Sequence, residues 1–259
     1  MRDISDILNE WPYDTSSFVR KIVAEDGREL IQVRTAMGIE QYELEGRPDG
    51  DEPVLEQVEA QLNEHIEEVG TPDGFEIDGA TVAELQHEGL LYYYRYLVCF
   101  QIGEYSVVET DTARNLRMFD LLRTYCKDEE LANASEQYRP YVLRMNAASR
   151  ALMAVGVSRY GRARAIIHAA IETISHLPDV PTATFEYEKR RSLAILRGMQ
   201  RAIPDDRPPT QEDLLKQQMH EAVVQENYEQ AAEIRDRLRK LALEHDQSPS
   251  PSPERTSND

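Results

Sequence analysis

QEDLLKQQMHEAVVQENYEQAAEIRDRLRKLAL, residues 211–243, has the apolar spacing of two helices joined by a short turn. In both halves the apolar residues recur mostly at intervals of 3 or 4, as on one face of an amphipathic helix. Between the halves, Asn227 is a good N-cap, and Gln230 completes a capping box. The stretch therefore predicts a helical hairpin. Its apolar residues are Leu215, Met219, Ala222 and Val223 in the first half and Ala231, Ile234, Leu238 and Leu241 in the second.

The same stretch resembles the UVR motif, which ends UvrB, lies within UvrC and recurs in adaptor proteins of the Clp protease system. The resemblance rests on Met219, Ala222-Val223, the run 227–232, Arg235-Asp236 and the two leucines that follow. It covers about 33 of the 259 residues. In the family, this hairpin associates with another hairpin of its kind, and its aromatic residue lies in the contact. Tyr228 takes a place often held by Phe, so its hydroxyl needs a partner or water.

The resemblance implies a set of contact and hairpin-packing residues. Two helices of this length cannot bury both apolar stripes against each other, so a further surface is needed to cover them. We therefore expect a protein partner at the hairpin: a UVR-containing, Clp-type or repair protein, or a second copy of this chain in a coiled-coil-like pairing. The expected interaction residues are Leu215, Met219, Ala222, Val223, Tyr228, Glu229, Ala231, Ala232, Arg235, Leu238 and Leu241.

The chain lacks the sequence patterns of the chemistry associated with UvrB and UvrC. No G-x-x-x-x-G-K-[ST] phosphate loop, G-x-S-x-G elbow or Ser-His-Asp spacing occurs in it. Its histidines form no H-E-x-x-H pair, and Cys99 and Cys126 are two isolated thiols in apolar helical stretches. We therefore expect no enzyme activity, no catalytic residues, no cofactor and no metal.

Proline and polar residues mark the borders of the hairpin. Residues 204–209 contain three prolines, which interrupt a helix and predict a linker. Residues 246–259 are polar and rich in Pro and Ser, which predicts a disordered tail. We therefore expect residues 210–245 to form a separable module.

The N-terminal segment, residues 1–78, predicts a small α+β domain. Asp26-Gly27 is a strong hairpin turn, and Met37-Gly38 is a second turn, so the chain predicts a three-stranded antiparallel meander. A three-stranded sheet needs a cover, and the amphipathic stretch 54–69 is the expected helix. The expected strands are 17–24, 30–35 and 39–44, preceded by a short helix at 3–10.

Residues 79–203 predict an all-helical domain, which makes the fold class α+β but predominantly α-helical. Pro140 either interrupts one long helix or stands in the first turn of a helix that starts near Glu136. Glycines before Tyr105 and Tyr160 resemble tetratricopeptide junctions, although the strict 34-residue pattern fails. Repeat-like helical hairpins and an irregular bundle both remain open. The expected helices are 80–101, 106–125, 129–154, 159–176 and 183–203.

Charge is distributed unevenly along this acidic chain, whose net charge is −19. Residues 1–80 carry −15, residues 81–203 carry +2 and residues 204–259 carry −6. Nucleic acid is thus an improbable partner, and the middle region is the only candidate for binding it. Its basic cluster either forms a solvated face, pairs internally with the acidic N-terminal segment, or docks phosphate or acidic peptides. The cluster consists of Arg159, Arg162, Arg164 and residues 189–191.

Four tyrosines lie within residues 92–96. On a helix they must point around most of its circumference, so we expect two in the core and two facing a groove between helix pairs. Such a groove is also a candidate peptide-binding surface, because tyrosine gives a large contact area at little entropic cost.

The leading functional expectation is a non-enzymatic adaptor or scaffold that acts through its UVR-type hairpin. No apolar run approaches the roughly 20 residues of a membrane span, and the N-terminus lacks a signal-peptide pattern, so we expect a cytoplasmic protein. The resemblance to the UVR motif implies a bacterial one. The alternative is a nucleic-acid-associated accessory factor of nucleotide excision repair that uses the basic cluster. An enzyme with an unrecognised N-terminal site is the third reading.

Overall fold

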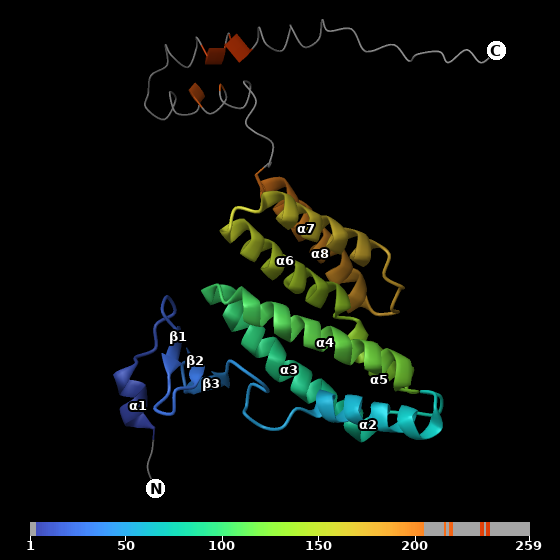
Figure 1. Ribbon diagram of the computed structural model, residues 1–259. Coiled ribbons are helices and arrows are strands. Elements are labelled where there is room, and N and C mark those ends of the chain that lie inside the picture. Colours follow the sequence, from blue (N-terminus) through green and yellow to red (C-terminus); the bar gives the residue numbers. More distant parts are fainter. Residues whose placement is uncertain (1–3, 205–214, 216–217, 220–233, 236, 239–259) are drawn as a thin grey trace, which may run out of the picture. The chain divides into compact units, whose positions relative to one another are not determined.

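Helices make up most of the structure, a computed structural model that describes residues 4–204, 215, 218–219, 234–235 and 237–238 (Figure 1). Contacts divide the chain into two units, residues 1–204 and residues 205–259. The first unit contains, in order, α1 (Ser5–Glu10), β1 (Val19–Val23), β2 (Glu29–Arg34), β3 (Ile39–Glu43), α2 (Val54–Val69), α3 (Gly79–Ile102), α4 (Tyr105–Tyr125), α5 (Glu129–Glu136), α6 (Arg139–Gly156), α7 (Tyr160–Ser175) and α8 (Ala183–Ala202).

The three strands form the predicted antiparallel meander, in the order β1-β2-β3. Ile22 pairs with Leu30 across the first turn, and Ile31 pairs with Tyr42 in the second strand pair. Gly27 takes a φ of 87°, a left-handed conformation that suits glycine, while the Asp26 carboxylate accepts the Arg28 N–H at 3.1 Å. The Asp-Gly turn therefore forms where the sequence indicated.

The prediction that helix 54–69 covers the sheet is wrong. The sheet buries Ile31, Val33 and Tyr42 against α3, α4 and α6, where Tyr96, Cys99, Val108 and Met145 complete the cluster. α2 has the predicted bounds, but its buried residues belong to another core. The apolar face of α2 is narrow, whereas α3 carries apolar residues on several faces. α3 can therefore pack against the sheet and against α2 at the same time.

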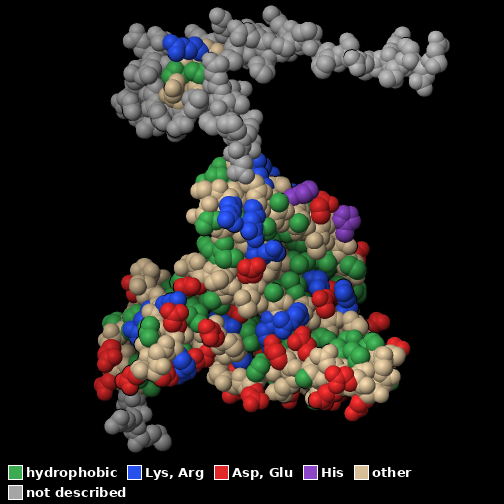
Figure 2. All heavy atoms as spheres, viewed as in Figure 1, with side chains coloured by type: hydrophobic (Ala, Val, Ile, Leu, Met, Phe, Trp, Pro, Cys, Tyr) green, Lys and Arg blue, Asp and Glu red, His purple; other side chains and the backbone are tan. Residues whose placement is uncertain are grey.

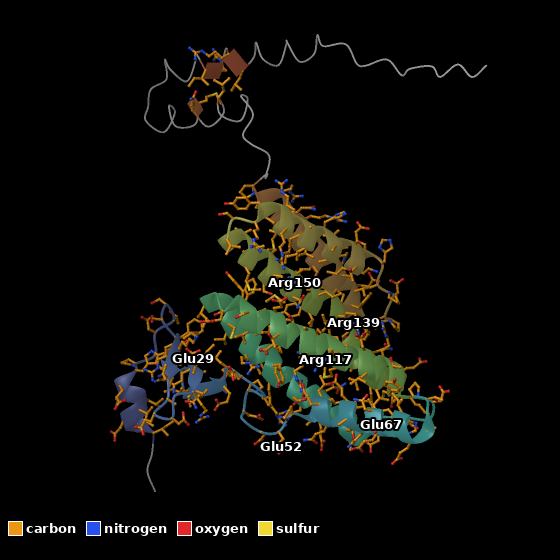
Figure 3. The ribbon with its side chains drawn as sticks, viewed as in Figure 1. Glu29, Glu52, Glu67, Arg117, Arg139 and Arg150 are labelled. Atoms are coloured by element: carbon orange, nitrogen blue, oxygen red, sulfur yellow. The ribbon has the colours of Figure 1, made fainter. Side chains whose placement is uncertain are left out.

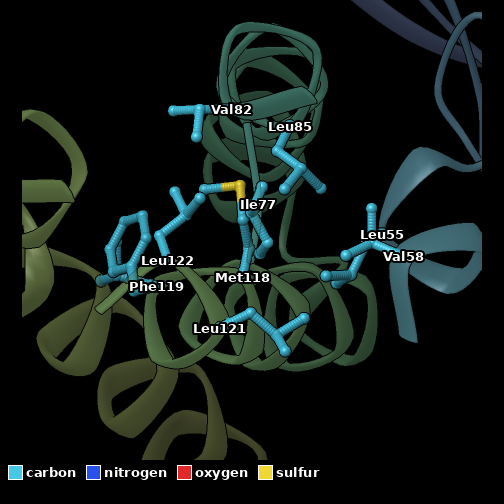
Figure 4. Packing of buried hydrophobic residues seen from close by; sticks show 10 residues of the cluster. Leu55, Val58, Ile77, Val82, Leu85, Met118, Phe119, Leu121 and Leu122 are labelled. Atoms are coloured by element: carbon cyan, nitrogen blue, oxygen red, sulfur yellow. The ribbon is translucent and has the colours of Figure 1, made fainter. Parts of the chain in front are cut away.

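A second core joins α2, α3 and α4. Leu55 and Val58 of α2 pack with Val82 and Leu85 of α3 around Met118 of α4, as Figure 4 shows. Both this core and the sheet core contain residues from before and after residue 79. The predicted segments 1–78 and 79–203 therefore share their hydrophobic interior.

A third core lies among α6, α7 and α8 and includes Ala151, Ala163, Ile167, Ile174 and Leu196. α6 contacts α4 on one side and both α7 and α8 on the other. These neighbour contacts leave open the choice between repeat-like hairpins and an irregular bundle.

The predicted helix 129–154 is divided in two, and α6 begins at Arg139 with Pro140 in its first turn. This confirms the second interpretation of Pro140, because a first-turn proline loses no intrahelical hydrogen bond. The other helices start and end within two residues of their predicted bounds.

Arginines on the surface of the middle region connect neighbouring helices (Figure 3). Arg117 of α4 pairs with Glu59 of α2 at 3.0 Å, and Arg150 of α6 pairs with Glu109 of α4 at 3.2 Å. Many of the region's positive charges are thus paired within the fold. Among the described residues, no helix has the length and apolarity needed to cross a bilayer.

Candidate functional site

The described residues of the C-terminal unit form a small apolar cluster. Leu215 and Ile234 are 8% and 4% exposed, and Met219 and Leu238 pack half-buried against them. These residues come from both halves of the stretch 211–243, and all four are helical. A contact between the two halves is what a helical hairpin requires.

Arg235 lies on the exposed side of this cluster. Leu215, Met219, Arg235 and Leu238 are thus the predicted interaction residues that the structure describes. Residues 205–209 of the predicted linker 204–209 and the predicted tail lie outside the described residues. So do the remaining predicted interaction residues: Ala222, Val223, Tyr228, Glu229, Ala231, Ala232 and Leu241.

In the first unit, a buried ion pair joins α3 to α4. Arg95 donates to both carboxylate oxygens of Asp111, at 2.9 and 2.6 Å, and both side chains are at most 3% exposed. Burial raises the pKa of Asp111, against the lowering effect of the Arg95 hydrogen bonds. Arg95 also donates to the backbone carbonyls of Glu43 and Gly46, which fixes the chain after β3.

Glu88, which is fully buried, fixes the start of α2. Its carboxylate accepts the backbone N–H groups of Val54 and Leu55 at 2.9 and 3.1 Å, and it pairs with Arg114 at 2.7 Å. Pro53 offers the helix no side-chain cap, so Glu88 supplies both the acceptor and the negative charge at the helix N-terminus. These buried charges are satisfied by partners within the fold.

The tyrosine-rich stretch places two of its four tyrosines in the core, as predicted. Tyr92 is 4% exposed, and the guanidinium groups of Arg114 and Arg95 lie 4.0 and 4.9 Å from its ring centre. Burial raises the pKa of Tyr92 to about 12. Tyr96 is buried as well, whereas Tyr94 is 49% exposed.

Tyr93 and Tyr96 line a cavity of about 450 Å³ between α3, α4, α5, α6 and α8. Most of its lining is apolar or aromatic, and Met118 and Val142, also in the lining, are each 2% exposed. Leu90 and Tyr138, which are about half exposed, also line it and place its opening at the surface. A groove between helices therefore exists, but Tyr93 and the core residue Tyr96 line it and Tyr94 does not, so the predicted division of two tyrosines in the core and two in the groove holds only in part.

The basic cluster finds partners in its own part of the chain. Lys189 donates to Asp179 and to the Leu177 carbonyl, and Arg191 pairs with Glu188 at 3.6 Å. Arg164 donates to the Ile203 carbonyl at 2.9 Å. Figure 2 shows acidic side chains over the sheet and α2, with basic side chains gathered nearer α7 and α8. Arg159, Arg162 and Arg190 of the cluster are exposed, as the solvated-face alternative predicts.

Among the described residues, no three His, Cys, Asp or Glu side chains are grouped as metal ligands would be. Cys99 is buried, Cys126 is half-buried, and neither forms a disulfide. Burial raises the pKa of the Cys99 thiol to about 12.

Sequence reasoning missed the buried polar residues Glu88, Asp111 and Asn115. A signal for them exists, because each interrupts an apolar helical stripe. Glu88 falls between Leu85 and Tyr92, and Asp111 and Asn115 fall between Val108 and Met118. A polar residue at such a position must find a buried partner.

Comparisons with known proteins give one match. No curated protein and no solved structure matches this chain. Residues 213–243 match the family described as UVR: UvrB/uvrC motif. The Leu215–Ile234 contact lies within the matched residues. The chain therefore contains a UVR motif, confined to this segment near its C-terminus.

Proposed function

We propose that the protein is a non-enzymatic adaptor or scaffold that binds a protein partner through its UVR motif. The match at residues 213–243 carries this proposal. The partner is a protein that presents a hairpin of the same kind, or a protease or repair component that carries one.

The described contacts give the proposal a physical basis. Leu215 and Ile234 are buried, but Met219 and Leu238 beside them are only half-buried. Two short helices leave part of their apolar surface in water, and a second hairpin placed against it would remove that surface from solvent. The motif falls in a unit separate from residues 1–204, which suits a binding module attached to a body.

Affinity capture with the whole chain tests the proposal. The wild type is compared with a Tyr228→Ala, Leu238→Asp variant, which removes the aromatic residue and places a charge on the apolar cluster. We expect the wild type to recover a protein that the variant does not. Gln218→Ala is the matched control, because Gln218 is exposed in the same segment, and it should recover the same protein as the wild type.

Recovery of the same proteins by the wild type and the double variant would refute the proposal. Circular dichroism melting of each variant checks that residues 1–204 remain folded, so that a lost partner reflects the motif.

A second candidate function is nucleic-acid binding by α7 and α8. Residues 159–203 contain eight Lys and Arg but four Asp and Glu. Arg159, Arg162, Arg190, Arg197 and Arg201 are all exposed there. Binding to duplex DNA at near-physiological salt, weakened by Arg162→Glu and Arg190→Glu, would support this candidate. Unchanged binding in these variants would exclude the patch.

A further inference from the structure

The tyrosine-lined cavity in the first unit contains buried polar atoms that lack partners. Asn115 is 3% exposed; its Nδ2 donates to the Gly89 carbonyl at 3.0 Å, but its Oδ1 has no hydrogen bond. Glu188 is 9% exposed; its Oε1 pairs with Arg191, but its Oε2 has no hydrogen bond. Both residues line the cavity. Each unpartnered buried oxygen costs free energy that a ligand could recover.

The two unpartnered atoms are both hydrogen-bond acceptors. The lining also holds the Arg191 guanidinium, which pairs with Glu188 Oε1, and among the described residues that line the cavity no buried side-chain donor lacks a partner. A complementary ligand must therefore bring N–H or O–H donors and few acceptors of its own. Carboxylate and amide side chains would add acceptors, whereas a guanidinium carries five N–H donors and no acceptor.

The walls of the cavity suit the rest of such a side chain. Tyr93, Tyr96 and Tyr141 lie together, with ring centres 5.5 to 6.4 Å apart, and all three line the cavity. Aromatic faces attract a guanidinium, and Met118 and Val142 offer apolar contact to an alkyl stem.

We propose that this cavity receives an arginine side chain from a partner protein segment, with its guanidinium donating to Asn115 Oδ1 and Glu188 Oε2. Leu90 and Tyr138, exposed at the opening, would contact the segment on either side of the arginine. A basic segment also suits the Glu188 carboxylate in the lining, one oxygen of which has no partner. The proposal rests on the proposed interaction function but assigns a second surface, in a different unit from the UVR motif.

Isothermal titration of the whole chain with the peptide acetyl-Gly-Leu-Arg-Leu-Gly-amide tests this. We expect saturable binding, weakened about tenfold or more when norleucine replaces arginine and the donors are lost. Citrulline keeps N–H donors but adds an acceptor oxygen, so its peptide should bind between these two. Equal binding of the norleucine and arginine peptides would overturn the proposal. If agmatine bound as tightly as the arginine peptide, the proposal that the ligand is a protein segment would be overturned.

Two variants locate the site. Glu188→Gln removes the charge at nearly constant volume, and Tyr138→Ala removes a half-exposed ring at the opening without disturbing the core. Both should weaken the arginine peptide about tenfold, whereas Glu186→Gln, an exposed position on the same helix, should leave its binding unchanged. Undiminished binding in both variants would overturn the assignment.

The UVR variant separates this proposal from the proposed function. Tyr228→Ala, Leu238→Asp should bind the arginine peptide as the wild type does, because the cavity lies entirely in the first unit. Loss of peptide binding in that variant would place the peptide at the motif and would overturn the cavity site.

Discussion

Arg95 of α3 and Asp111 of α4 form a two-pronged ion pair in the interior, with both Asp111 oxygens engaged. The same guanidinium holds two backbone carbonyls at the end of the sheet, at Glu43 and Gly46. One side chain therefore connects the helix pair to the chain that leaves β3. Because the Arg95 guanidinium and the Asp111 carboxylate hydrogen-bond to each other, neither buried charge is left unpaired, which would destabilise the fold.

Asp111→Ala should destabilise the protein by about 3–5 kcal/mol, because it leaves the Arg95 guanidinium buried without its anion. Denaturant unfolding followed by circular dichroism measures this. Lys127→Ala is the control: its pair with Glu76 lies at the surface, so little change is expected. A loss for Asp111→Ala no larger than that of the control would contradict the structural role.

Two helical glycines should respond differently to alanine. At Gly198 an added Cβ meets nothing within 4 Å, so Gly198→Ala should raise the free energy of unfolding by about 0.5–1 kcal/mol through helix propensity. At Gly89 it would lie 2.9 Å from the Met118 Cε, so Gly89→Ala should gain less or lose stability. Thermal melting compares them, and an equal gain at both sites would show that Met118 does not limit the approach of α3 and α4.

The two thiols should differ in reactivity. Cys99 is fully buried and burial raises its thiol pKa to about 12, so little thiolate forms at neutral pH, whereas Cys126 is half-buried. Alkylation of the native protein with iodoacetamide, read by mass spectrometry, should label Cys126 alone, and both thiols should react in denaturant. Cys99→Ser is the control that assigns the second label. Rapid native labelling of Cys99 would mean that the sheet core opens readily.

Glu56 gives a prediction for acid pH. Burial opposes its ionisation, but the hydrogen bond and charge of Arg114 prevail and hold the pKa of Glu56 below its ordinary value of 4.5. A carboxyl whose folded pKa is lowered stabilises the fold above its unfolded pKa, and that contribution disappears as pH falls through the folded value.

The stability difference between wild type and Glu56→Gln should therefore be present at neutral pH and shrink as pH falls below about 4.5. Urea unfolding at a series of pH values measures it. Glu64→Gln, at an exposed position of the same helix, should show no such dependence. A difference that is constant down to the acid limit would mean that the Glu56–Arg114 pair does not contribute.

Local patterns predicted the elements because their causes are local. In the Asp26-Gly27 turn, Gly27 takes a positive φ that glycine adopts without strain. Pro140 fits a helix in its first turn, which is where it lies in α6. A local sequence pattern does not say which element an apolar helix face packs against. The stripe of α2 indicated a buried face, but only the assembled helices show that it meets Val82 and Leu85 and not the sheet.

The candidate sites divide in the same way. The UVR motif is a continuous pattern and could be recognised from residues 213–243 alone. The cavity is assembled from five helices, and its two acceptors, Asn115 and Glu188, are 73 residues apart in sequence. The tyrosine run indicated a groove, but the chemistry of its interior depends on side chains from helices that the run does not contain.

The central claim is that the UVR motif binds a protein partner. Hydrogen–deuterium exchange of the whole chain, alone and with the protein recovered by affinity capture, tests it most directly. Exchange within residues 213–243 should be slower when the partner is bound. Unchanged exchange throughout residues 213–243, with protection confined to residues 4–204, would contradict it.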